Sequence, residues 1–223
     1  MNPITWQLVK KDWDISKWPM VGYATLGAIA LFLVSTATQV SFIIGSNLLI
    51  TVLVVIGIHL IFVSVVHERS KQTLPFIMSL PITFMQYTRA KMIANLGVFG
   101  LAWLVIAIAV VAILTTNADL PNGMVPFSMI VMGELFAANV LILSVAIITE
   151  SEAWTLVVMG ACNVCIALFM FFIRSFEGIS AHIEGSVAVW NSTTGIALGL
   201  EVLAIATFVA LTFYAQSRKN DYL

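Results

Sequence analysis

Two cysteines three positions apart, in Cys162-Asn163-Val164-Cys165, could hold a metal ion or form a redox couple. They lie inside an apolar run, however, without the strand and helix context of a redox fold. We therefore interpret both as small buried hydrophobic side chains. His67-Glu68 does not continue into the second histidine of an H-E-x-x-H zinc motif, so no metal-binding residues are predicted.

Motifs for catalysis are also missing from the sequence. It contains no G-x-x-x-x-G-K-[ST] loop, so we expect the chain not to bind nucleotide phosphates itself. No nucleophile and base occur with the spacing of a catalytic motif. We therefore expect a non-enzymatic chain that binds no cofactor of its own.

Four ionisable residues lie within or at the ends of apolar runs, where charge is costly and functional roles are common: Glu134, Glu201, Arg174 and His59. Both carboxylates are predicted to lie in the outer half of the membrane, at the level of Arg174. They could line a transport pathway, or one of them could form an ion pair with Arg174. His59 is interpreted as a hydrogen-bonded packing residue rather than a proton relay, because no carboxylate shares its run.

The composition that surrounds these residues is typical of a membrane protein. Of the 223 residues, 61% are hydrophobic and 9% are charged, and the mean hydropathy is +1.04. Soluble domains contain roughly 25% charged residues. The formal net charge of −1 provides no basic excess for a phosphate backbone, so no nucleic-acid partner is expected.

Six apolar runs are long enough to cross a bilayer as helices of about 20 residues. They cover residues 20–40, 42–66, 92–115, 126–149, 153–174 and 196–215. A tight turn at Gln39-Val40-Ser41 is predicted to join the first two as an antiparallel hairpin. The sequence thus predicts an all-α membrane protein, with a six-helix transmembrane domain over residues 20–223.

The basic residues indicate the orientation of these helices. Nine of the ten lysines and arginines fall on one side of the predicted membrane, and only Arg174 falls on the other. The nine are Lys10, Lys11, Lys17, Arg69, Lys71, Arg89, Lys91, Arg218 and Lys219. The positive-inside rule therefore predicts a multi-pass protein of the cell (inner) membrane with both termini in the cytoplasm.

Two polar segments have helical periodicity. In residues 1–19, Trp6, Val9 and Trp13 share one face, which predicts an amphipathic helix on the cytoplasmic membrane surface. In residues 175–195, apolar side chains recur at helical spacing and predict one or two short outer helices between the fifth and sixth spans. A disordered outer loop is the alternative for this second segment.

Residues 67–91 form an unusual loop between the second and third spans, with four of the ten basic residues and two prolines. Pro75 suits the first turn of a short helix, and Pro81 should end it. Leu74, Ile77 and Met78 would then form one apolar face on a helix of under two turns. Such a helix cannot bury that face alone, so a cytoplasmic partner is expected.

The order of residues in this loop resembles the permease subunits of the ABC transporter type-2 family, whose pattern is close to E-R-x-x-G-T-L-x-x-L-x-S-L-P-I-S followed by A-K. The matching residues here are Glu68-Arg69, Thr73-Leu74, Ser79-Leu80-Pro81-Ile82 and Ala90-Lys91. Gln72 replaces the usual small residue and Thr83 the usual serine. The six-span plan with an amphipathic N-terminal segment also resembles that family.

The resemblance implies a permease subunit of an ATP-driven exporter that forms a homodimer or heterodimer and binds two copies of a separate ATPase subunit. ATP and Mg²⁺ would bind to that partner, and the loop would hold the coupling helix that docks in the ATPase. The substrate would move outward along a dimer interface lined by the second and fifth spans. The implied coupling residues are Glu68, Arg69, Thr73, Leu74, Pro75, Ile77, Met78, Leu80 and Pro81.

Other functions remain open from the sequence. An ion-coupled secondary transporter or a channel could use Glu134 or Glu201 as its coupling group, although that class often shows inverted repeats and none is evident here. A membrane protein with no transport role would also fit the six spans. The apolar composition would suit a lipid, a peptide or a hydrophobic drug as substrate.

Overall fold

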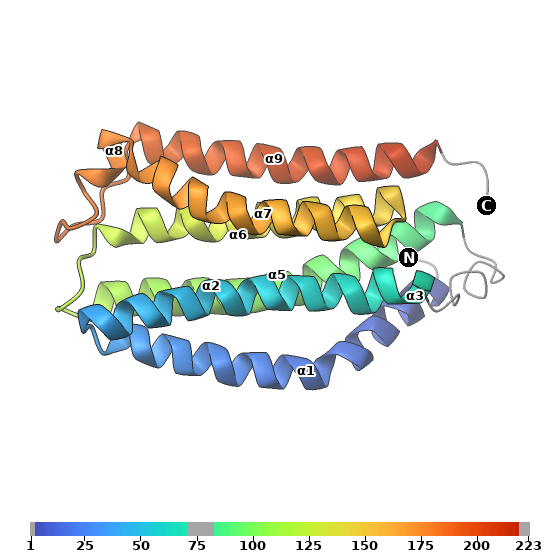
Figure 1. Ribbon diagram of the computed structural model, residues 1–223, viewed down its shortest axis with the longest axis horizontal. Helices are drawn as coiled ribbons and strands as arrows, with labels where there is room; N and C mark the ends of the chain where they lie inside the picture. The colour runs from blue at the N-terminus through green and yellow to red at the C-terminus, as the bar shows by residue number, and fades with distance from the viewer. Residues whose placement is uncertain (1–2, 71–82, 219–223) are drawn as a thin grey trace.

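The computed structural model describes residues 3–70 and 83–218, and over these residues the chain is helical with no strands. The long helices lie alongside one another in a bundle, and both ends of the chain lie at the end of the bundle where α3 ends and α5 begins (Figure 1). The helices are α1 (Pro3–Ser35), α2 (Gln39–Ile61), η1 (Phe62–Val66), α3 (His67–Ser70), α5 (Phe84–Thr116), α6 (Met124–Thr149), α7 (Glu152–Arg174), α8 (Glu177–Ser180) and α9 (Ser192–Ser217).

Six of these helical segments are long and apolar enough to cross a membrane, which confirms the predicted number of spans. The second span joins α2 to η1, a π-helix that continues it without a break. The segments are Thr5–Ser35, Gln39–Val66, Phe84–Thr116, Met124–Thr149, Glu152–Arg174 and Ser192–Ser217.

The turn between the first two spans differs from the prediction. It lies at residues 36–38, where Ala37 adopts a left-handed conformation with φ 55°. Gln39-Val40-Ser41, predicted as the turn, is the first turn of α2, and the Thr38 side chain caps it by accepting from the Ser41 amide. Threonine is one of the residues favoured at a helix N-cap, so α2 begins directly after Thr38.

The N-terminal segment is continuous with the first span, since α1 runs through Pro19. Proline inside a helix removes a backbone hydrogen bond and favours a bend. Figure 1 shows α1 bent, with its N-terminal part rising toward the other helices. Trp6 and Trp13 point outward, with 59% and 43% of their surfaces exposed, whereas Leu8 and Asp12 are buried.

The core of the bundle is built around α6. This helix contacts α2, α5, α7 and α9, and 72% of the residues in its most apolar window are buried. The corresponding share is 17% in α7 and 11% in α9, which leave most of their apolar side chains on the outside. Helices with such surfaces require an apolar solvent, and a bilayer provides it.

A glycine allows α1 and α2 to approach closely in their hairpin. A Cβ atom at Gly45 would lie 2.8 Å from the carbonyl oxygen of Ala30 and 2.8 Å from the amide nitrogen of Val34. Both of those atoms belong to the α1 backbone, so a side chain on α2 at this position would have to push the helices apart.

At the opposite end of the bundle from the termini, the α7–α9 connection folds onto the α5–α6 connection. The Gly123 amide donates to the carbonyl of Gly185 at 2.8 Å, and the Asn122 side chain donates to the carbonyl of Ser186 at 3.1 Å. Among residues 175–191 the only helix is the single turn α8, which buries Ile179.

Candidate functional site

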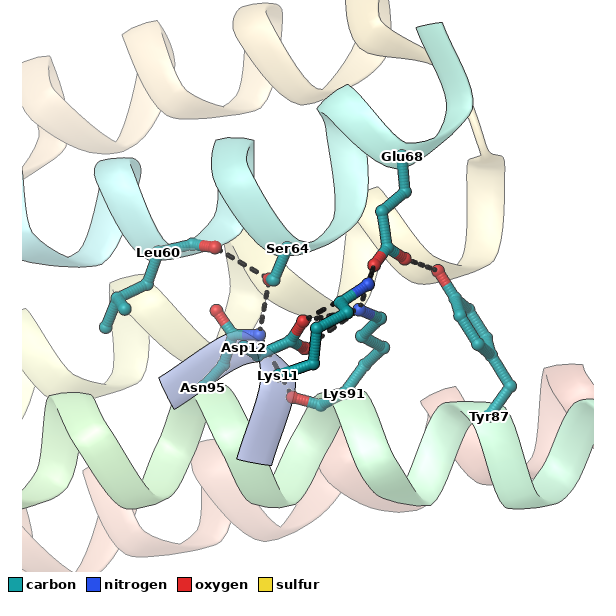
Figure 2. A network of polar contacts seen from close by, with 8 residues as sticks. All are labelled: Lys11, Asp12, Leu60, Ser64, Glu68, Tyr87, Lys91 and Asn95. Carbon is teal, nitrogen blue, oxygen red and sulfur yellow. Dashed lines mark hydrogen bonds and ion pairs between the residues drawn. The ribbon is translucent and has the colours of Figure 1, made fainter. Parts of the chain in front are cut away.

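A fully buried lysine lies at the end of the bundle that holds both termini. Lys91, on the second turn of α5, has none of its surface exposed. Its Nζ lies 2.8 Å and 3.1 Å from the two carboxylate oxygens of Asp12 and 2.8 Å from Oε1 of Glu68 (Figure 2). These carboxylates come from α1 and α3, so one ammonium group holds three helices together.

Two further side chains complete this ion cluster, which we define as Lys11, Asp12, Glu68, Tyr87 and Lys91. Lys11 forms an ion pair with Glu68 and lies 3.7 Å from Asp12, and the Tyr87 hydroxyl donates to Oε2 of Glu68 at 3.1 Å. With two lysines and two carboxylates, the cluster has no net charge. Buried charges are tolerated when they are paired and hydrogen-bonded in this way.

Local structure on both sides positions the ion cluster. On one side, η1 carries Ser64, whose hydroxyl donates to the carbonyl of Leu60 at 2.6 Å and accepts from the Asn95 amide at 2.8 Å. On the other side, Thr83 and Gln86 form a reciprocal capping box that fixes the start of α5, one turn before Tyr87. Short π-helices such as η1 are frequent at functional sites.

The ion cluster includes one of the predicted coupling residues and four residues that the sequence analysis did not assign to a site. Glu68 is 7% exposed and turned into the bundle. The Arg69 side chain and the predicted residues Thr73, Leu74, Pro75, Ile77, Met78, Leu80 and Pro81 lie outside the part of the chain that the structure describes.

The arrangement links the two flanks of residues 71–82. Glu68 precedes this segment and Tyr87 and Lys91 follow it, yet the three side chains are in direct contact. A force on the segment would therefore move α3 and the start of α5 together, and Asp12 would carry that movement to α1. Charge-assisted hydrogen bonds are well suited to such a rigid connection.

The other two predicted carboxylates come together elsewhere, in a groove between α6, α7 and α9. Glu134 of α6 and Glu201 of α9 both line this groove, whose volume is about 530 Å³. Glu201 is 6% exposed, and both of its carboxylate oxygens are buried without a hydrogen-bond partner among the described residues. Glu134 is half-buried.

Arg174 does not form the ion pair with Glu134 or Glu201 that was one of the two predicted alternatives. Its guanidinium lies over the ring of Phe127, 4.8 Å from the centroid, and within residues 3–70 and 83–218 it has no ion pair with Glu134 or Glu201. Phe127 is in the first turn of α6, and Glu134 lies two turns further along, about 10 Å away at 1.5 Å per residue. Arg174 thus meets α6 at a different level from the carboxylates.

The remaining polar candidates are packing residues. His59 meets the ring of Tyr23 edge-on, with centroids 5.7 Å apart, and its buried Nε2 has no hydrogen-bond partner among the described residues. Cys162 is buried as predicted, whereas Cys165 is exposed because α7 turns much of its surface outward. The described residues contain no cluster of metal-ligating side chains.

Comparison of the chain with protein-family models, curated proteins and solved structures finds no match. The function is therefore inferred from the residues of the ion cluster, from the groove and from the resemblance carried by residues 67–91.

Proposed function

We propose that this chain is the transmembrane permease subunit of an ATP-driven ABC exporter, which dimerises and couples to two separate ATPase subunits. The observation that carries the proposal is the ion cluster. It joins both flanks of the segment whose sequence resembles a coupling loop, and it ties them to a third helix. ATP and Mg²⁺ would bind to the partner ATPase, and this chain would convert the movement of that partner into movement of α1, α2 and α5.

The neutral, buried character of the ion cluster supports this role. A coupling loop must transmit a displacement to the helices without deforming. Rigid, packed contacts transmit such a displacement well. Lys91 has no exposed surface, and each carboxylate that it contacts is at least nine-tenths buried. The flanks of residues 71–82 therefore move as one body with the helices that they join.

The dimer contact is assigned to α7, the fifth span. Its outward face carries large apolar side chains such as Val164 and Phe171, with 62% and 80% of their surfaces exposed. The resemblance implies that the second and fifth spans line the path of the substrate between two subunits. Of these two spans, α7 has the free surface, whereas 56% of the corresponding window of the second span is buried inside the chain.

The coupling role predicts the effect of a charge at Leu74, on the apolar face that the sequence predicts for its short helix. Leu74→Asp should weaken binding of the ATPase subunit by about tenfold or more, since burial of one such side chain contributes about 1.5–3 kcal/mol. Co-purification with the ATPase subunit and ATP-driven transport in vesicles measure the loss. The matched control is Val187→Asp, at an exposed site in the α7–α9 connection. An intact Leu74→Asp complex with a normal transport rate would disprove the coupling role.

We place the ion-cluster end of the bundle in the cytoplasm, because nine of the ten basic residues fall on that side. In a chain without Cys162 and Cys165, a single cysteine at Ser180 should react with an impermeant thiol reagent in intact cells, and one at Ser217 should not. Both serines are exposed. Labelling of the cysteine at Ser217 alone would reverse the orientation.

A second candidate function is supported by the groove. Glu134 and Glu201 share one apolar groove and form no ion pair with any described residue, an arrangement that would also suit ion-coupled transport in which one of them binds the coupling ion. The two functions differ in their energy source. Uptake into vesicles that depends on an ion gradient and continues without ATP or an ATPase subunit would favour this second function.

A further inference from the structure

The groove between α6, α7 and α9 has an apolar wall and an acidic one. Phe169, Phe172 and Phe176 line it from the α7 side, and Glu134 and Glu201 line it from α6 and α9. The volume of about 530 Å³ is in the range of small-molecule sites, which are about 300–1,000 Å³.

The carboxylate of Glu201 fits into a space that a glycine on the neighbouring helix leaves open. Gly133 of α6 lies directly opposite, and a methyl group there would overlap the carboxylate and lie 2.8 Å from its Cδ atom. The glycine thus leaves room for a charged group that receives no hydrogen bond from the described residues. A buried, ionised carboxylate without a partner is costly in a membrane, and a cation bound beside it would offset that cost.

No described residue supplies a positive charge to this site. Arg174 also comes from α7, but it is held over the ring of Phe127 and pairs with neither carboxylate within the described ranges. A bare divalent cation would require six or more oxygen ligands for Ca²⁺ or an octahedral set for Mg²⁺. A groove walled by phenylalanines and small apolar residues offers few of them. Aromatic rings instead favour an organic cation, through their negative faces and apolar area.

We propose that this groove binds lipophilic organic cations, with Glu201 as the counter-ion, Glu134 as a second carboxylate and the phenylalanine wall around the apolar body of the ligand. Binding of the cation requires no ATPase subunit and does not depend on the proposed function. Only the further statement that such cations are the exported substrates rests on the proposed function. It replaces the open choice among lipid, peptide and drug with one chemical class.

The test uses the purified full chain in lipid nanodiscs and radiolabelled tetraphenylphosphonium, a cation with four aromatic rings. We expect saturable binding, and Glu201→Gln should lower the affinity by about tenfold or more, because it removes the counter-ion and keeps the size of the side chain. Gly133→Ala keeps both charges but displaces the carboxylate, and should also weaken binding. Glu177→Gln, at an exposed residue of α8, is the control and should bind as the unmodified chain does.

The anion tetraphenylborate separates charge recognition from partition into an apolar groove, because it has nearly the same shape. It should not compete with tetraphenylphosphonium. Equal affinities of the unmodified chain and Glu201→Gln for the cation, no saturable binding, or equal binding of the anion would each overturn the inference. Binding of the cation without its ATP-driven export would leave the binding site standing and contradict only the assignment of such cations as exported substrates.

Discussion

Lys91→Met should lower the free energy of unfolding by about 3–5 kcal/mol, the typical cost of breaking a buried ion pair by removing one partner. The substitution removes one of the two ammonium groups of the ion cluster and leaves its two carboxylates beside Lys11, which is 40% exposed, so the five residues of the cluster would change from neutral to a net charge of −1. Thermal or denaturant unfolding of the detergent-solubilised chain measures the loss. The proposed coupling should also weaken, because α1 would lose the ion pair between Asp12 and α5.

Two further variants test whether the buried ion pairs of Lys91 cause this loss of stability. Lys17→Met removes an exposed ion pair with Asp14, 2.9 Å long, and should cost less than about 1 kcal/mol. Adding Asp12→Asn to Lys91→Met restores the neutrality of the ion cluster and should recover a large part of the stability. Equal losses for Lys91→Met and Lys17→Met would show that the cluster does not hold the helices together.

Gly45→Val should destabilise the α1–α2 hairpin by about 1–3 kcal/mol or more, the cost of overpacking a close contact. The new side chain would collide with the α1 backbone at Ala30 and Val34, and backbone atoms cannot rotate away as a side chain can. The measurement is again the unfolding midpoint in detergent. Gly22→Val is the matched control, because a Cβ at Gly22 would meet no described atom within 4 Å beyond its own stretch of helix. Similar midpoints for the two variants would contradict the close approach of the helices.

Much of the fold follows from the sequence because hydropathy and length alone define a membrane-spanning helix. The errors are at helix ends, where a few hydrogen bonds decide the outcome. Gln39 and Ser41 were predicted to form a turn, but Thr38 caps a helix that begins there. The third span was predicted to start at residue 92, whereas α5 begins at Phe84, since a capped polar first turn adds no hydropathy.

The candidate sites were predictable only in part. Glu134 and Glu201 were identified because a carboxylate in an apolar run is unusual, but their shared groove depends on how α6 and α9 pack. Lys91 was counted among the basic residues of a cytoplasmic loop, and nothing in its sequence neighbours indicates that it is fully buried. Its partners come from distant positions in the chain. The sequence feature that could have indicated the ion cluster is the presence of opposite charges at the same end of two predicted spans.

The ion cluster depends on the π-helix η1 as well as on its charged residues, because η1 sets the direction in which the following residues leave the helix. An α-helix turns about 100° per residue, and a π-helix accommodates extra residues through i→i+5 hydrogen bonds. If Phe62–Val66 became ordinary α-helix with all five residues kept, the chain would turn further over this stretch and Glu68 would rotate by about 100° relative to α2, away from Lys91. Loss of the π-helical hydrogen bonds, with no residue removed, would therefore change the helical phase and separate Glu68 from Lys91 while every charge of the cluster remained in the sequence.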